Sequence, residues 1–261
     1  MSTETDPVAT ARAENEALAE RLGVHALSLT VQRREQLTPS CVRLRLAGDD
    51  LAAIDPVPGQ DLMISIGIDG DRTRRRRYTI RHLDRTGRTV DLDVALHGDG
   101  PGIRWATSAE PGDAVEALGP RGKVTLDPGA VWHLFVGDDS FAPAALNMAE
   151  GVGEDKLVLL ALEIDGAGHE QDSEIRATVT GPRWVRRDGA SCGDPTPLAR
   201  ALAGIELPPG PGHAYIGGEH AVVSALRDAL IERSMPEDAI NAKSYWRLGR
   251  QNAANGEPER A

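Results

Sequence analysis

Three side chains on one extended segment have the chemistry to hold a phosphorylated aromatic ligand. Arg76 offers a planar guanidinium that can donate paired hydrogen bonds to phosphate oxygens. Tyr78 offers a flat ring on which another ring system can stack, and Thr79 offers a hydroxyl for a ring heteroatom. An ordinary barrel strand with an exposed arginine would contain the same residues. The segment alone therefore leaves both interpretations open.

A glycine-rich stretch further along the chain is suited to an anion. His97, Gly98, Gly100 and Gly102 lead into a short helix-compatible segment that continues through Ile103. Glycines ahead of a helix leave backbone N–H groups available at its N-terminus, where the helix dipole favours negative charge. A phosphate-binding turn and an aromatic strand in one domain indicate a flavin dinucleotide.

One motif of a hydrolase, G-x-S-x-G at residues 189–193, lacks its usual context. A nucleophile elbow needs a strand directly before the serine and a helix starting at it. Here the helix begins only at Thr196, and Asp194 is the only Asp between Ser191 and the later His213. We interpret the stretch as a glycine-rich loop. The chain also lacks His-Glu-x-x-His, Cys-x-x-Cys and complete P-loop motifs, so no metal site is expected.

The overall charge and composition exclude several classes of protein. There are 29 Lys and Arg against 40 Asp and Glu, a formal net charge of −11, which argues against a nucleic-acid partner. Cys41 and Cys192 cannot form a disulfide framework. No stretch approaches the roughly 18 apolar residues of a membrane span, and the N-terminus has no apolar signal region. We expect a cytoplasmic protein.

Arginines are nevertheless concentrated just before the aromatic strand. Arg72, Arg74, Arg75, Arg76 and Arg77 lie close together in an otherwise acidic chain. Exposed charge runs are usually solvated surface. Next to a strand that binds a ligand, the same arginines can form a local positive surface for an anionic substrate.

Hydrophobic periodicity divides the chain into two domains. Residues 23–127 alternate apolar and polar side chains between Gly- and Pro-containing turns, which predicts a small antiparallel barrel. Residues 128–250 alternate apolar strands with amphipathic helices, which predicts a doubly wound parallel sheet. Residues 1–22 are expected to form a flexible tail with one short helix from Ala11 to Arg21, and residues 251–261 a disordered tail.

A series of short motifs runs from about Val31 to Gly249. They are Pro58-Gly59-Gln60, Arg76-x-Tyr78-Thr79-x-Arg81, His97-Gly98 with Gly100-Pro101 and Trp105-Ala106, Pro111-Gly112-Asp113, Gly119-Pro120-Arg121-Gly122, Gly137-Asp138-Asp139-Ser140 with Pro143-Ala144, Trp184 with Arg187, Gly218-Glu219, and Tyr245-Trp246-Arg247. In this order and spacing, the chain resembles the siderophore-interacting proteins. These are flavin-dependent ferric-siderophore reductases of the ferredoxin-reductase-like superfamily.

The resemblance implies a FAD-dependent reductase that converts Fe(III) to Fe(II) in a ferric siderophore, with NAD(P)H or ferredoxin as electron donor. It implies FAD in the barrel and NAD(P)H at the turn from Gly137 to Ala144. The expected cofactor-binding residues are Arg76, Tyr78, Thr79, His97, Gly98, Gly100, Gly102, Ile103, Asp138, Ser140, Pro143 and Trp246. The residues expected to bind an anionic ferric siderophore are Arg72, Arg74, Arg75, Lys243 and Arg247. No catalytic side chain is expected, because the flavin carries the chemistry.

Three positions depart from the family pattern. Ile103 stands where a hydroxyl residue is usual near the FAD pyrophosphate, Phe141 enters the turn after the first strand of the second domain, and Ser244 replaces a glycine. The backbone amides of Gly102 and Ile103 remain available in principle for the pyrophosphate. These departures leave a second hypothesis open, a non-enzymatic siderophore- or flavin-binding carrier on the same fold.

Overall fold

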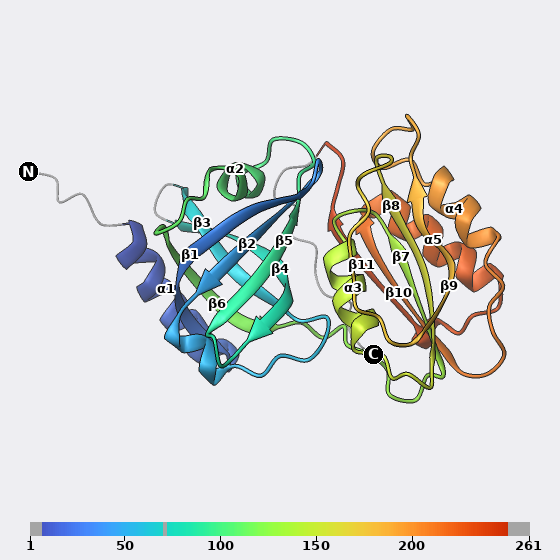
Figure 1. The fold of residues 1–261 in the computed structure, drawn as a ribbon, viewed down its shortest axis with the longest axis horizontal. Helices are drawn as coiled ribbons and strands as arrows, with labels where there is room; N and C mark the ends of the chain where they lie inside the picture. The colour runs from blue at the N-terminus through green and yellow to red at the C-terminus, as the bar shows by residue number, and fades with distance from the viewer. Residues whose placement is uncertain (1–6, 70–71, 250–261) are drawn as a thin grey trace, which may run out of the picture. The chain divides into compact units, whose positions relative to one another are not determined.

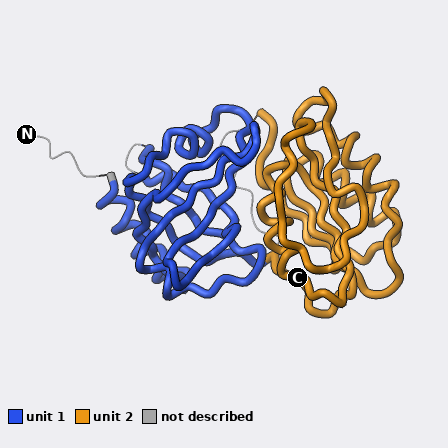
Figure 2. The backbone as a smooth tube through the Cα atoms, viewed as in Figure 1, with its two compact units in different colours: residues 1–123 blue, residues 124–261 orange. Residues whose placement is uncertain are grey.

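The chain folds into two units, residues 1–123 and 124–261 (Figure 2). The structure is a computed structural model that describes residues 7–69 and 72–249. The expected fold class, a barrel followed by a doubly wound sheet, is confirmed. The boundary between the units lies at residues 123 and 124, four residues before the expected one. The expected tail at 251–261 lies outside the described residues.

Six antiparallel strands close into a barrel in the first unit (Figure 1). The strands are β1 (His25–Thr38), β2 (Cys41–Ala47), β3 (Asp61–Asp69), β4 (Arg72–Asp84), β5 (Thr89–Ala95) and β6 (Ala114–Arg121), in the order β1-β2-β5-β4-β3-β6. Pairing of β1 with β6 closes the barrel. Inward positions such as Leu44, Leu62 and Leu92 are fully buried, as the alternation of apolar residues predicts. A 3-10 turn η1 (Asp49–Ala53) and helix α2 (Pro101–Ser108) complete this unit's connections.

An N-terminal helix, α1 (Pro7–Leu22), packs against the barrel strands β6 and β1. This differs from the expected flexible tail with a helix confined to Ala11–Arg21. The reason is a set of contacts that the sequence pattern does not reveal. Asn15 is fully buried, its Nδ2 donates to Ser65 Oγ at 3.2 Å and its Oδ1 accepts from Arg75 Nε at 2.9 Å. Arg12 donates to Glu116 on β6 at 3.0 Å.

The second unit is a five-stranded parallel sheet with helices on both faces. Its elements are β7 (Trp132–Gly137), α3 (Ala142–Glu150), β8 (Leu157–Ile164), β9 (Thr178–Arg186), α4 (Thr196–Ala203), β10 (Gly212–Glu219), α5 (His220–Glu232), η2 (Glu237–Ala239) and β11 (Ile240–Trp246), with strand order β11-β10-β7-β8-β9. Helix α3 packs with Phe135 and Tyr215 on one face of the sheet. Helices α4 and α5 pack with Leu134 and Ile216 on the other. No helix among the described residues is long and apolar enough to cross a membrane.

Both edge strands of this sheet, β9 and β11, are absent from the sequence-based assignment. Strand β9 contains Gly181 and Pro182, which normally mark a turn. Proline is tolerated there because β9 is an edge strand with one unpaired side. Strand β11 is only half-buried along its length, so its residues lack a continuous apolar run.

We predict that Arg75→Ala loosens α1 from the barrel. Arg75 donates to Asn15 at 2.9 Å and to Glu14 Oε2 at 2.8 Å, and the change leaves the buried Asn15 oxygen without this donor. We expect a loss of about 1–3 kcal/mol in the free energy of unfolding and faster amide hydrogen exchange in α1. Arg74→Ala is the matched control. Its partner Asp69 is exposed, so this change should cost no more than about 1 kcal/mol. Equal effects of the two variants would contradict the assignment.

Candidate functional site

An aromatic strand and a helix N-terminus meet on the barrel. Tyr78 on β4 stacks on Trp105 of α2, with ring centroids 5.6 Å apart and planes 23° from parallel. A Cβ atom at position 102 would lie only 2.5 Å from Tyr78 Oη and 3.3 Å from Arg76 Cγ. Gly102 therefore lets the first turn of α2 approach both side chains. The expected group Arg76, Tyr78 and Gly102 is indeed close together.

The first turn of α2 has one backbone donor available. Pro101 at the first helical position has no N–H, and the amides of Ile103 and Arg104 both donate to Gly100 O at 3.0 Å. Within the described residues, the Gly102 N–H has no acceptor. The turn contains no acidic side chain. The Gly102 amide is therefore the donor that an anion at this end of α2 would meet. The sequence predicts that the amides of both Gly102 and Ile103 are available, but the Ile103 amide already donates to the Gly100 carbonyl.

Arg76 adds a cation beside that amide. The side chain is half-buried, and its Nη1 donates to the Arg75 carbonyl at 2.7 Å. Burial lowers the pKa of Arg76, so its charged form would be stabilised by a nearby anion. Burial likewise raises the pKa of Tyr78, which keeps the phenol neutral. Thr79 is buried beside them on β4.

The remaining barrel residues of the predicted site lie in the connection between β5 and α2. His97 is half-buried and Gly98 is exposed with φ of +73°, a left-handed conformation that favours glycine. Gly100 caps α2 with an extended backbone and supplies the carbonyl for its first hydrogen bonds. The loop thus delivers the chain to α2 in the direction that places Gly102 against β4.

The arginine run does not form one surface. Arg74 pairs with the exposed Asp69, and Arg75 with Glu14 and Asn15 of α1. Arg77 pairs with the buried Asp61, with Nη2 and Oδ2 2.7 Å apart. The side chain of Arg72 lies outside the described residues. Because successive side chains of β4 point to opposite faces of the strand, these arginines reach different partners.

In the second unit, Asp138 organises the carboxyl ends of three strands. Its Oδ1 accepts from the backbone amide of Ser140 at 3.0 Å and from that residue's hydroxyl. Its Oδ2 accepts from the Glu219 amide at 2.7 Å and from Trp246 Nε1 at 2.9 Å. The expected group Asp138, Ser140 and Trp246 is therefore brought together, with the Asp138 carboxylate already engaged by protein donors. Pro143 is buried in the first turn of α3.

The unusual Phe141 packs into the core of this unit. Its ring is buried and contacts Tyr245 edge-on, with centroids 5.9 Å apart. A Cβ at Gly217 would lie 2.3 Å from the Phe141 ring, and a Cβ at Gly137 would lie 2.8 Å from it. Glycines on β7 and β10 therefore create the space that this phenylalanine fills.

A cluster of acids around one buried arginine escaped the sequence analysis. Arg187 donates to Glu163 Oε1 at 3.1 Å and to Asp165, and its Nη2 lies 3.8 Å from Asp139 Oδ2. Burial raises the pKa of Glu163 to about 7 despite Arg187. Burial, followed by the charge of Asp138, raises the pKa of Asp139 to about 7. The sequence does contain one indication of this cluster, because Glu163 is a charged residue within an otherwise apolar strand.

The two basic residues expected near the C-terminus lie on or just after β11. Lys243 Nζ lies 5.5 Å from the centroid of the Tyr245 ring, a cation–π contact. Arg247 follows the strand and is half-buried, with no hydrogen-bond partner for its side chain among the described residues. Ser244, the third departure from the family pattern, lies 3.1 Å through its Oγ from His220 Nδ1. The described residues contain no cluster of His, Cys, Asp or Glu able to hold a metal ion.

We predict that Gly217→Ala destabilises the protein by about 1–3 kcal/mol through overpacking against Phe141. The same substitution in a Phe141→Ala background should cost less, because the ring atoms at 2.3 and 2.6 Å are gone and only the Cβ of residue 141 remains, at 3.0 Å. Chemical unfolding of the four chains of this double-mutant cycle measures the coupling. Additive effects would mean that the ring does not depend on Gly217.

We predict that Glu163→Gln flattens the pH dependence of stability. In the folded protein the pKa of Glu163 is raised to about 7, whereas a glutamate in the unfolded chain has a pKa near 4.3. The unfolded chain therefore releases this proton at a lower pH than the folded chain does. The stability that Glu163 contributes is thus present below about pH 4.3 and lost as the pH rises to 7. Unfolding measured between pH 4 and 8 should show a smaller decline in the variant.

The raised pKa of Asp139 also lowers stability as the pH rises, so part of this loss of stability should remain in Glu163→Gln. The control is Glu232→Gln at the exposed end of α5, which should keep the wild-type profile. Parallel profiles for Glu163→Gln and the wild type would contradict the prediction.

Comparisons with known proteins find relatives of both units. The family model described as the siderophore-interacting FAD-binding domain matches residues 68–124, and the model described as siderophore-interacting protein matches residues 130–249. The ferric vibriobactin reductase ViuB of Vibrio cholerae is 31% identical over 188 residues, which cover 69% of this chain and 66% of that protein. The matches span 65% to 66% of the length of such curated relatives.

Solved structures give the same result. A siderophore utilization protein from T. fusca superimposes with a TM-score of 0.78 at 29% identity, covering 89% of this chain and 96% of that one. The ferredoxin-NADP+ reductase of Plasmodium falciparum shares the fold, with a TM-score of 0.62 at 10% identity over 82% of this chain and 94% of that one. The barrel is a FAD-binding domain, and the chain belongs to the family of siderophore-interacting proteins.

Proposed function

We propose that the protein is a FAD-dependent reductase that converts Fe(III) to Fe(II) in ferric siderophores. The observation that supports this most directly is the meeting of Arg76, Tyr78 and the Gly102 amide on the barrel. A cation, a stacking ring and a free backbone donor suit the pyrophosphate and ring system of a dinucleotide. The relative named as a ferric vibriobactin reductase supports the same reaction.

Each residue has a definite task toward the flavin. Arg76 and the Gly102 N–H would bind the pyrophosphate, since both offer donors to an anion. Tyr78 would stack on a ring, with Trp105 behind it fixing its plane. Thr79 would donate its hydroxyl to a ring heteroatom. Gly102 is essential to this arrangement because any side chain there would collide with Tyr78.

The chemistry requires no nucleophile or general base from the protein. Bound FAD supplies it, by accepting two electrons from a donor and releasing them singly to iron. Siderophore oxygens are hard ligands that favour Fe(III), so reduction weakens the complex and frees the metal. Lys243 and Arg247 of the second unit would attract an anionic ferric complex, whereas Arg74 of the barrel already pairs with Asp69. Arg75 is less suited to this task, because α1 already engages it.

We propose NAD(P)H as the donor, bound by the second unit at the carboxyl ends of its parallel strands, where such sheets bind nucleotides. Reduced ferredoxin is the other candidate. We place the reaction in the cytoplasm. Phe141 does not argue against nucleotide binding by the turn at residues 137–144, because its ring is buried in the core beside Gly137 and Gly217.

A spectrum of the purified protein tests the proposal. The protein should absorb in the visible range as a flavoprotein, lose this absorption when NADPH is added without oxygen, and regain it when a ferric siderophore is added. A ferrous chelator should then trap Fe(II). A flavin that neither NAD(P)H nor reduced ferredoxin bleaches would identify a carrier instead.

We predict that Tyr78→Ala loses most of its flavin, whereas Tyr78→Phe retains it. Stacking of a base on an aromatic ring contributes about 1–3 kcal/mol, and the phenylalanine ring preserves it. The FAD-to-protein ratio after gel filtration gives the measurement. Equal flavin content in the wild type and in Tyr78→Ala would remove Tyr78 from the site.

A further inference from the structure

Helix α1 contacts the barrel through Asn15, whose side chain is fully buried. Its Nδ2 donates to Ser65 Oγ of β3 at 3.2 Å, and its Oδ1 accepts from Arg75 Nε of β4 at 2.9 Å. Ser65 and Arg75 lie directly opposite each other in the β3–β4 ladder. One amide group therefore joins both members of a cross-strand pair, one residue before Arg76.

The pair that Asn15 joins lies where the pairing of the two strands becomes irregular. The register of β3 with β4 shifts between Ser65 and Ile68, with one extra residue on β3. On its other side, β4 pairs with β5 only from Ile80 onward among the described residues. The segment of β4 that carries the proposed flavin-binding residues thus has a partner strand on one side, and its regular pairing ends at Ser65. Helix α1 supplies an additional attachment at this point.

A second bond from α1 strengthens the attachment. Arg75 Nη2 donates to Glu14 Oε2 at 2.8 Å. The hydrogen bond from Arg75 is the main cause of the lowered pKa of Glu14, which keeps this carboxyl group ionised. Arg75 Nη1 also donates to the Thr73 carbonyl at 3.3 Å. The Arg75 guanidinium thus connects α1 to the backbone of β4.

Arg76 is coupled to this attachment through the backbone. Its Nη1 donates to the Arg75 carbonyl at 2.7 Å, so the position of that carbonyl orients the Arg76 guanidinium. Successive side chains of a strand point to opposite faces. Arg75 faces α1, whereas Arg76 faces the first turn of α2, where a Cβ at Gly102 would lie 3.3 Å from Arg76 Cγ. A movement of the backbone at residue 75 therefore changes the donor geometry on the opposite face.

We propose that Asn15 is a positioning residue for FAD: acting through Arg75, it fixes the backbone that orients Arg76 toward the pyrophosphate, so that α1 sets the affinity for the cofactor. This inference rests on the role proposed for Arg76 and is independent of ferric siderophore reduction. A donor that is already oriented costs less to order when the ligand binds. Loosening α1 leaves every residue of the proposed flavin site present but raises that cost.

The test compares FAD with riboflavin, which carries the ring system but no pyrophosphate. The dissociation constants of both are measured by flavin fluorescence, with the full-length protein after removal of its cofactor. Asn15→Leu keeps the charge of Arg75 but removes both hydrogen bonds of the amide. We expect FAD affinity to fall about fivefold, the equivalent of one ordinary hydrogen bond, and riboflavin affinity to change less than about twofold.

A conservative variant should preserve the effect of Asn15. In Asn15→Asp the carboxylate still accepts from Arg75, and the Ser65 hydroxyl can donate to it, so FAD affinity should stay within about twofold of the wild type. Arg12→Gln loosens α1 at a different point, its bond to Glu116 at 3.0 Å, and should leave both affinities unchanged.

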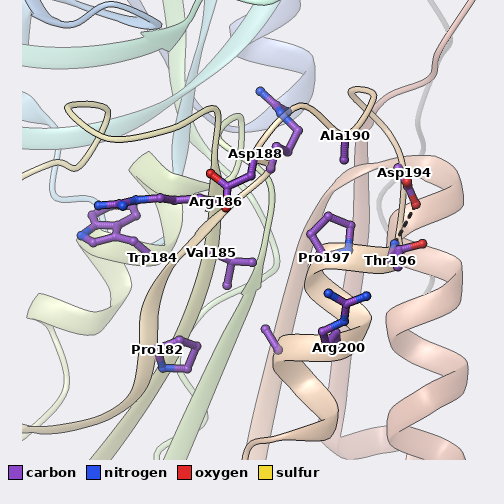
Figure 3. A pocket seen from close by; sticks show the side chains of 12 residues that line it. Pro182, Trp184, Val185, Arg186, Asp188, Ala190, Asp194, Thr196, Pro197 and Arg200 are labelled. Atoms are coloured by element: carbon purple, nitrogen blue, oxygen red, sulfur yellow. Dashed lines mark hydrogen bonds between the residues drawn. The ribbon is translucent and has the colours of Figure 1, made fainter.

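Arg75→Gln removes the same attachment together with a charge, and should weaken FAD at least as much as Asn15→Leu does. Arg200→Gln is the control for the lost charge. This exposed arginine belongs to the second unit, where it lines a cavity of about 510 Å³ between β9 and α4 (Figure 3). The control should bind FAD like the wild type.

Equal losses of FAD and riboflavin affinity in Asn15→Leu, or the same loss of FAD affinity in Arg12→Gln, would overturn the proposal, because they would indicate a general effect on folding. Arg76→Gln reports separately on the proposed flavin site. Wild-type FAD affinity in that variant would overturn the role of Arg76 and this inference with it. Weakened FAD binding in Arg76→Gln but not in Asn15→Leu would overturn the inference alone.

Discussion

The second unit depends on one buried carboxylate, that of Asp138. It accepts hydrogen bonds from Ser140, Glu219 and Trp246, which follow or end β7, β10 and β11. These bonds offset the cost of burying a charge and bring three strand ends to one point. Burial, and then the charge of Asp138, raises the pKa of the adjacent Asp139. Arg187, reaching in after β9, is the counterion that this arrangement requires.

The ion pairs of Arg187 affect the charge at the end of β8. Its guanidinium contacts Glu163 within β8 and Asp165 directly after it, so it offsets part of their negative charge. In the barrel, most arginines of the run are likewise engaged by acids.

Local patterns were sufficient to predict the fold class. The alternation of apolar and polar residues is strong in the barrel, and the alternation of apolar strands with amphipathic helices is strong in the parallel sheet. They also led to the group of Arg76, Tyr78 and Gly102, whose members lie on a strand and a helix start that each have a recognisable sequence. They failed where the partner is distant in the chain. The pairing of Arg75 with α1 joins residues 61 positions apart, and nothing in either segment identifies the other. The pair Glu163 and Arg187 was missed for the same reason.

The departures from the family pattern have different physical consequences. Phe141 is large, but Gly137 and Gly217 leave space for its ring, so the change is absorbed within the core. Ile103 has no such compensation: its amide bonds Gly100, and its side chain offers no hydroxyl to an anion. The anion-binding capacity of α2 therefore rests on the Gly102 amide and on Arg76 beside it. In the proposed flavin site, fewer donors place a greater share of the binding energy on ring stacking, so we expect Tyr78, stacked on Trp105, to contribute most to flavin retention.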